Sequence, residues 1–234
     1  LSTQNIDKNG EIKDLLIKYN SASDISSTGG QMPRLLGLAQ ASKIVRQKPE
    51  MEKYLKNNVA GNEVAFGMIG DASTSEGVFW ETMNAAGVMQ VPLVAAVYDD
   101  GYGISVPIEL QTTKSSISEA LKGLKKEKNT NGIEIYTGKG WDYEGLVNMF
   151  KTGVAKTRKT HTPALFHIQE LTQQLGHSTS GSQERYKPKE RLAWENEFDC
   201  NIKMKQWLLD NKIADSVALS EIEKKAKKRA KEAR

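Results

Sequence analysis

From residue 64 onward, short apolar runs alternate with segments whose apolar residues have helical spacing. VAFGMIGD (64–71) and VPLVAAVYDD (91–100) each predict a buried strand that ends in acidic residues. GVFWETMNAAGVM (77–89), which lies between them, predicts a helix that starts near Ser75 and buries Trp80 and Met83. Strand and helix therefore alternate in this part of the chain.

The same pattern returns further along the chain. GIEIYTG (132–138) and TPALFHIQEL (162–171) predict two more strands, the second with His167 packed or at an edge, and residues 142–159 between them predict a helix capped by Asp142. Strands that are apolar throughout and alternate with helices are typical of a parallel sheet with helices on both faces. The predicted fold class is therefore α/β.

The two ends of the chain do not show this alternation of strand and helix patterns. Residues 1–20 predict an irregular N-terminal segment, whereas residues 34–47 predict a helix with Pro33 in its first turn and with Leu35, Leu38, Ala39 and Ile44 on one face. Two helices, roughly 189–211 and 219–233, close the chain, the second capped by Ser220. We expect one domain over 21–215, followed by a charged helical linker or tail over 216–234.

Composition narrows the possible functions. With 234 residues and 38% hydrophobic content the chain can bury one sizeable core. The net charge of +4 is small, and the basic run KKAKKRAKEAR (224–234) predicts a solvated helix, so no nucleic-acid partner is expected. Because no long apolar run or signal segment is present and Cys200 is the single cysteine, with a small buried thiol as its expected role, we expect a cytoplasmic protein without a membrane span. Since the chain starts at Leu1 and stops within a charged helical pattern, we interpret it as part of a longer polypeptide, excised or proteolytically processed.

Carboxylates follow two of the predicted strands. In an open parallel sheet the ligand crevice lies beyond the carboxyl ends of the strands, where Asp71 and the pair Asp99-Asp100 fall. Helix capping is the simpler explanation for such residues. However, the small residues beside Asp71 leave room for a bulky anion, and a helix opening at Ser73 to Glu76 would attract phosphate through its amides. A Mg²⁺ or Ca²⁺ ion would reconcile the carboxylates with that phosphate.

These residues also carry a resemblance to a known family. GDAS (70–73) followed by YDDGYGIS (98–105) resembles the thiamine diphosphate motif, and TGGQMPRLLGLAQASK (28–43) and GHSTSGSQERY (176–186) are similar to two further segments of one family. That family is the alpha subunits of the E1 component of 2-oxo acid dehydrogenases, of the pyruvate and branched-chain type. The resemblance covers about residues 21–215, with four motifs in the family's order.

The resemblance implies a set of site residues. Mg²⁺ ligands would be Asp71, Asp100 and the backbone carbonyl of Tyr102, while His177 would be the catalytic residue, reaching the diphosphate and the substrate side. Gln31 and Pro33 would shape the wall near the aminopyrimidine. The implied cofactor-binding residues are Ser26, Thr28, Gly70, Asp71, Ala72, Ser73, Tyr98, Asp100, Tyr102, Ile104 and His177.

Three departures from the family's pattern bear on this site. Asp100 stands where the family has Asn, which adds a negative charge that would strengthen Mg²⁺ binding but weaken diphosphate attraction unless a nearby base compensates. Ala72 replaces a Gly of the motif, and ELTQQLG (170–176) lacks an Arg that the family commonly uses on the cofactor phosphate. The serines and threonine of the loop after His177 (Ser178, Thr179, Ser180 and Ser182) could be phosphorylated, which would disfavour cofactor binding.

The resemblance implies a half-site. The chain would bind Mg²⁺ and the diphosphate of thiamine diphosphate. It would decarboxylate a 2-oxo acid and transfer the acyl group to a lipoyl-E2 acyltransferase only beside a beta subunit or fused beta half, as a dimer or heterotetramer. Two alternatives remain open: a nucleotide-binding dehydrogenase, although no G-x-G-x-x-G follows a strand, and a non-catalytic assembly module that has lost the cofactor.

Overall fold

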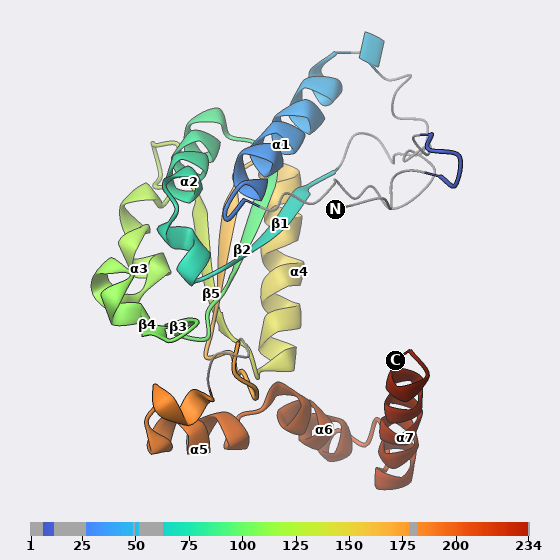
Figure 1. Cartoon of the computed structure of the whole chain (residues 1–234). Coiled ribbons are helices and arrows are strands. Elements are labelled where there is room, and N and C mark those ends of the chain that lie inside the picture. The colour runs from blue at the N-terminus through green and yellow to red at the C-terminus, as the bar shows by residue number, and fades with distance from the viewer. Residues whose placement is uncertain (1–6, 12–26, 49, 52–62, 178–181, 234) are drawn as a thin grey trace.

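A four-stranded parallel sheet forms the centre of the molecule in the computed structural model, which describes residues 7–11, 27–48, 50–51, 63–177 and 182–233. The strand order is β1 (Ala65–Gly70), β2 (Leu93–Tyr98), β6 (Ala164–Gln169) and β5 (Glu134–Lys139), with every neighbouring pair parallel (Figure 1). The predicted α/β class with a parallel sheet is confirmed. Most of segment 1–20, together with Ser26 and residues 178–181, lies outside the described residues.

Helices cover both faces of the sheet, as the sequence predicts. On one face lie α1 (Gln31–Gln47), α2 (Gly77–Met89) and the short α3 (Ile117–Ala120), and on the other lies α4 (Tyr143–Thr160) (Figure 1). Each face has its own apolar core. Buried residues such as Leu35, Phe79 and Met83 pack on the first, with Trp80 partly buried against them, whereas Phe166 stacks on Phe150 of α4 on the second.

Local sequence explains the ends of two helices. The Asp142 side chain accepts a hydrogen bond from the Gly145 amide, so it is the predicted N-cap of α4. Pro33 lies in the first turn of α1, where its missing N–H removes no helical bond. On the predicted apolar face of α1, Leu35 and Ala39 are buried, but Leu38 is exposed.

The prediction that β1 is a buried strand is wrong. Strand β2 is buried from Leu93 to Val97, whereas Phe66 and Met68 of β1 are each 50% exposed. In the described sheet β1 is an edge strand and pairs with β2 alone. An apolar run does not reveal whether its strand is central or at an edge.

The predicted start of α2 also needs correction. Residues Ala72–Ser75 form a separate 3-10 turn, and α2 begins at Gly77. Glu76 between them has extended backbone angles (φ −67°, ψ 132°), which no α-helix contains. The hydroxyl of Thr74 donates to the Asp71 carbonyl, a local bond that competes with regular helix formation.

Three helices, not the predicted two, close the chain, and they lie beyond the carboxyl ends of the strands (Figure 1). The predicted helix over 189–211 is interrupted at Asp199, whose carboxylate accepts from two amides and caps a new helix. Asp215, not Ser220, caps the last helix. Cys200 is only partly buried. The helices are α5 (Lys189–Glu197), α6 (Cys200–Asp210) and α7 (Ser216–Glu232).

The remaining elements are short. They are β3 (Tyr102–Gly103), β4 (Val106–Pro107) and the 3-10 turns η4 (Ile108–Leu110), η5 (Thr113–Ser115), η6 (Lys122–Leu124) and η7 (Gln183–Arg185). Among the residues that the structure describes, no helix has the length and apolar character needed to cross a bilayer. The hairpin of β3 and β4 follows closely on Asp99-Asp100, after Gly101.

Candidate functional site

A cleft of about 720 Å³ opens at the carboxyl ends of β1 and β2, within the size range of small-molecule sites. Leu171, Thr172 and Gln173, which follow β6, form part of its wall. Ten of the residues that the resemblance implies as cofactor-binding line it, and the eleventh, Ser26, lies outside the described residues. The ten are Thr28, Gly70, Asp71, Ala72, Ser73, Tyr98, Asp100, Tyr102, Ile104 and His177.

Backbone pairing between two strands sets the position of Asp71. The β1–β2 register places Gly70 opposite Tyr98, and the Asp71 amide continues the ladder by donating to the Tyr98 carbonyl at 2.9 Å. The Thr74 hydroxyl and amide both donate to the Asp71 carbonyl, at 2.6 and 3.0 Å. The backbone of Asp71 is thereby fixed from both sides, beside the start of the Asp99–Tyr102 loop.

Three carboxylates are crowded at this end of the sheet. Asp71 and Asp99 are 6% and 5% exposed. Burial raises the pKa of Asp71 to about 7, and the neighbouring carboxylates of Asp99 and Asp100 add to that shift. Burial also raises the pKa of Asp100. The Oδ2 atom of Asp71 is buried and has no hydrogen-bond partner among the described residues, so the site lacks a positive group at this oxygen.

The loop after β2 folds back on its own side chains. The Gly101 amide donates to Asp99 Oδ1 at 2.8 Å, and the Tyr102 amide donates to Asp100 Oδ1 at 3.1 Å. Gly101 has a φ of +79°, a conformation that glycine adopts without steric cost. The loop is thus held with Asp100 and Tyr102 both lining the cleft.

Backbone strain occurs at the tip of the adjacent hairpin. Ile104, between β3 and β4, has a φ of +60°, which is rare for a β-branched residue. Close by, a side chain at Gly103 would approach the Ala72 Cβ to 2.7 Å, so the glycine at 103 makes room for alanine at 72. The structure therefore has room for Ala72 in place of the motif's Gly, and a strained residue at a ligand cleft is typical of functional sites.

Sequence reasoning missed the hydrogen-bonding role of His167. It correctly predicts a packed residue, and His167 is fully buried in β6. Its Nε2 lies 2.7 Å from Asp99 Oδ2, and its Nδ1 lies 2.9 Å from the Ser118 hydroxyl. The available signal was a histidine inside an otherwise apolar strand, because a buried imidazole requires hydrogen-bond partners.

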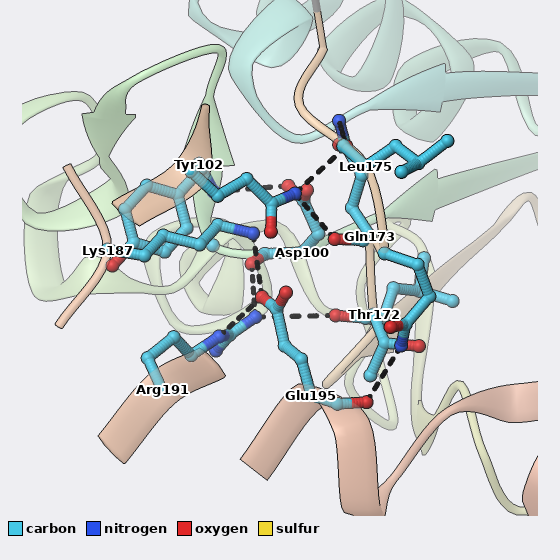
Figure 2. Close-up of polar contacts among 12 residues, drawn as sticks. Asp100, Tyr102, Thr172, Gln173, Leu175, Lys187, Arg191 and Glu195 are labelled. Atoms are coloured by element: carbon cyan, nitrogen blue, oxygen red, sulfur yellow. Dashed lines mark hydrogen bonds and ion pairs between the residues drawn. The ribbon is translucent and has the colours of Figure 1, made fainter. Parts of the chain in front are cut away.

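Two basic residues near Asp100 come from α5 and the residues just before it. Lys187 and Arg191 both counter the upward shift in the Asp100 pKa, and Arg191 Nη2 donates to the Asp100 carbonyl at 2.7 Å (Figure 2). Neither residue lines the cleft, and the described part of its lining contains no Lys or Arg. Thr172 and Gln173, from the segment that lacks the Arg implied by the resemblance, line the cleft.

The described residues contain no group of three or more His, Cys, Asp or Glu side chains arranged to hold a metal ion. The candidate set of Asp71, Asp100 and the Tyr102 carbonyl has two such side chains and a backbone oxygen. This all-oxygen set suits Mg²⁺, which takes one or two carboxylates and completes its coordination with phosphate oxygens and water. The unpartnered Asp71 Oδ2 fits such an ion.

The known proteins that this chain resembles in sequence are named as alpha subunits of dehydrogenases. The pyruvate dehydrogenase E1 component subunit alpha of Rickettsia felis is 27% identical over 205 residues, which cover 88% of this chain and 56% of that protein. The subunit of the same name in Rickettsia typhi is 28% identical over 196 residues, 84% of this chain and 53% of the relative. The 3-methyl-2-oxobutanoate dehydrogenase subunit alpha of Mycobacterium tuberculosis is 30% identical over 132 residues, 56% of this chain and 34% of the relative.

The chain spans about half the length of the curated relatives it matches first. Because these relatives are named as dehydrogenase subunits, the comparison does not favour a non-catalytic assembly module. The sequence profile described as "Dehydrogenase E1 component" matches residues 9–234, which is nearly the whole chain. The chain belongs to the dehydrogenase E1 component family.

Proposed function

We propose that this chain is the diphosphate- and metal-binding half of a thiamine diphosphate-dependent 2-oxo acid dehydrogenase E1. Its family and the names of its relatives, which are E1 alpha subunits for pyruvate or 3-methyl-2-oxobutanoate, support the reaction class. The fold supports it as well, because the cleft lies at the carboxyl ends of parallel strands, where ligands bind in open α/β sheets.

The observation that carries the proposal is the unpartnered Asp71 Oδ2. A carboxylate oxygen buried without a partner costs stability, and this one belongs to a residue that lines the cleft, where a bound ion would satisfy it. Asp71, Asp100 and the backbone carbonyl of Tyr102 would hold Mg²⁺. The cation would offset the burial that raises the pKa of both carboxyl groups and the repulsion that Asp99 and Asp100 exert on Asp71.

Small and hydroxylic groups would receive the diphosphate beside the metal. Gly70, Ala72 and Ser73 line the cleft next to Asp71 and offer little steric obstruction to phosphate oxygens. Tyr98 borders this region from β2. Because the described lining contains no Lys or Arg, most of the attraction for the diphosphate would come from the metal ion.

The opposite side of the cleft would hold the organic part of the cofactor. Thr28 and Ile104 line the cleft, whereas Gln31 is not among its described lining residues and donates from its amide to the Met68 carbonyl at 3.1 Å. Ser26, outside the described residues, keeps its proposed place near the aminopyrimidine. Thiamine diphosphate, when bound, supplies the electron sink for decarboxylation of a 2-oxo acid.

His177 is the proposed catalytic residue of this chain. It is exposed and lines the cleft, so its imidazole can reach a bound substrate or phosphate. In that position it would donate a hydrogen bond to a carboxylate or phosphate oxygen and orient the substrate. Residues 178–181, which follow it, lie outside the described part of the chain.

Completing the enzyme would require other protein parts. We propose a beta subunit or fused beta half that supplies the pyrimidine-activating carboxylate, a dimeric or heterotetrameric assembly, and a lipoyl-E2 acyltransferase as acyl acceptor, all in the cytoplasm. Within this chain, residues 21–215 form the proposed cofactor-binding domain and 216–234 the linker or tail.

A calorimetric titration tests the cofactor site. Thiamine diphosphate is titrated into the chain with and without Mg²⁺, first alone and then with its beta partner. We expect binding that requires Mg²⁺ and that is lost in Asp71→Ala, because the metal bridges Asp71 to the diphosphate.

The matched control is Glu81→Gln, an exposed carboxylate on α2 downstream of the same motif, which should bind like the unchanged chain. Binding of equal strength without Mg²⁺, or in Asp71→Ala, would refute the metal-bridged site. Absence of binding even with the beta partner would refute the proposed function.

A further inference from the structure

The segment from Lys187 to Glu195 contacts the Asp99–Tyr102 loop. This loop carries two of the three proposed metal ligands and is called the metal loop. Arg191 Nη2 donates to the Asp100 carbonyl at 2.7 Å, and the neighbouring nitrogen Nη1 lies 3.9 Å from the position of a Cβ on Gly101. The guanidinium also lies over the Tyr102 ring, 5.7 Å from its centroid. One side chain of α5 thus bonds the Asp100 carbonyl and lies near Gly101 and the Tyr102 ring, and its Nη2 also lies 3.4 Å from the Leu171 carbonyl.

The guanidinium is itself fixed by a buried acid. Arg191 Nε donates to Glu195 Oε1 at 2.8 Å, one helical turn along α5. The Lys187 ammonium donates to the same oxygen at 2.7 Å and lies 5.0 Å from the centroid of the Tyr102 ring (Figure 2). Glu195 and Lys187 are 2% and 5% exposed, so this pair is desolvated and sensitive to loss of a partner.

The charges in this cluster balance. Asp100 and Glu195 contribute two negative charges, and Lys187 and Arg191 contribute two positive ones. Lys187 and Arg191 offset the negative charge of Asp100, which otherwise adds to the charges of Asp71 and Asp99. The arrangement therefore matches an aspartate at 100.

We propose that Arg191, held by Glu195, is a positioning residue for the metal loop: it fixes the backbone at Asp100 and balances the charge of the Asp100 carboxylate. The inference rests on the proposed function for its consequence in metal binding. Its structural part, a loop held by Arg191, is measurable in the metal-free chain.

Amide hydrogen exchange in the metal-free full chain tests the structural part. We expect Arg191→Met to speed exchange at the Gly101 and Tyr102 amides at least tenfold while exchange in β6 stays unchanged, because methionine keeps the stem packing but donates no hydrogen bond. Lys189→Met, an exposed residue on the same helix, is the matched control and should exchange like the unchanged chain. Arg191→Lys keeps the charge but lacks the planar fork, so its exchange should be intermediate.

Magnesium titration in the presence of thiamine diphosphate and the beta partner tests the functional part. We expect Arg191→Met to weaken Mg²⁺ binding at least fivefold and Arg191→Lys to restore part of that loss. In an Asp100→Asn background the effect of Arg191→Met should be smaller, because there is less charge to balance.

The outcomes separate the two claims. If the unchanged chain binds no Mg²⁺ or cofactor, the proposed function is wrong, while the exchange rates alone still decide the positioning role. If the unchanged chain binds both, and Arg191→Met leaves exchange and Mg²⁺ affinity unchanged, the positioning role is wrong. If Arg191→Met weakens Mg²⁺ binding equally in the unchanged chain and in Asp100→Asn, Arg191 does not act by balancing the charge of the Asp100 carboxylate.

Discussion

At the scale of single residues, Asp71 shows how a buried carboxylate destabilises the folded protein that carries it. Its carboxylate is buried beside two others, and one of its oxygens has no partner among the described residues. Burial raises its pKa from 3.8 to about 7, so the folded state holds the proton more tightly than the unfolded chain. Ionisation of Asp71 therefore lowers the free energy of unfolding of the metal-free protein.

We predict that Asp71→Asn stabilises the metal-free chain by about 1–3 kcal/mol at pH 8. Because the folded pKa is the higher one, the penalty of the charged form is absent below about pH 4 and grows as the pH rises to about 7. The difference in free energy of unfolding between Asp71→Asn and the unchanged chain should grow over the same pH range. Urea unfolding of both chains in a chelating buffer measures it. Equal stability of the two chains at pH 8 would contradict the prediction.

His167, inside the sheet, forms a hydrogen bond with Asp99, one of the three crowded carboxylates. It is bonded to Asp99 and Ser118, and all three residues are buried. We predict that His167→Phe lowers the free energy of unfolding by about 2–4 kcal/mol, because it leaves a buried carboxylate without its partner. Ser118→Ala should cost about 1 kcal/mol. Chemical unfolding of both variants is the measurement, and a smaller loss for His167→Phe than for Ser118→Ala would contradict this account.

The residues at the cleft differ in how far sequence alone could place them. Asp71 and Asp100 each follow an apolar run that predicts a strand. Because the strands are parallel, this position alone puts both residues at the carboxyl ends of the strands. The bonds of Asp99 to His167 and of Arg191 to the Asp100 carbonyl span 68 and 91 residues. Such contacts depend on strand order and on the path of α5, which no local pattern specifies.

At the scale of elements, the hairpin of β3 and β4 concentrates strain beside the cleft. Ile104 has a φ of +60°, a conformation that glycine adopts readily and a β-branched residue does not. We predict that Ile104→Gly raises the free energy of unfolding by about 1 kcal/mol and weakens Mg²⁺-dependent binding of thiamine diphosphate, because it removes a side chain that lines the cleft.

The neighbouring Ser105→Gly is the matched control for that change. Ser105 is exposed and is not among the described residues with positive φ, so glycine there relieves no strain and should slightly lower stability. Thermal melts and calorimetric titration of both variants give the two readouts. A loss of stability in Ile104→Gly would show that the hairpin is unstrained.

Secondary structure was predictable where the local signal was complete. Strand β2 is apolar and buried up to Val97, strand β6 is buried up to Ile168 with His167 as its buried polar residue, and the carboxylate before α4 caps it as predicted. The exposure of β1 follows from its edge position, and the break between α5 and α6 follows from the cap at Asp199. Helical spacing continues across that break, so periodicity alone predicts one helix where the structure has two.

At the scale of the whole molecule, the proposed half-site makes stability depend on ligand. Anything that binds the folded state alone stabilises it by mass action, about 2.7 kcal/mol at a hundredfold excess over the dissociation constant. We predict that Mg²⁺ and thiamine diphosphate together raise the melting temperature of the chain with its beta partner. A chelator should remove this gain. The same gain with thiamine diphosphate alone would contradict a metal-bridged site.

The most direct measurement locates the metal. Crystals of the chain with its beta partner, grown with thiamine diphosphate and Mn²⁺ in place of Mg²⁺, give an anomalous difference map at the manganese edge. The account predicts a peak between the carboxylates of Asp71 and Asp100, next to the backbone carbonyl of Tyr102. Bound cofactor with the manganese peak elsewhere, or with no peak, would contradict it.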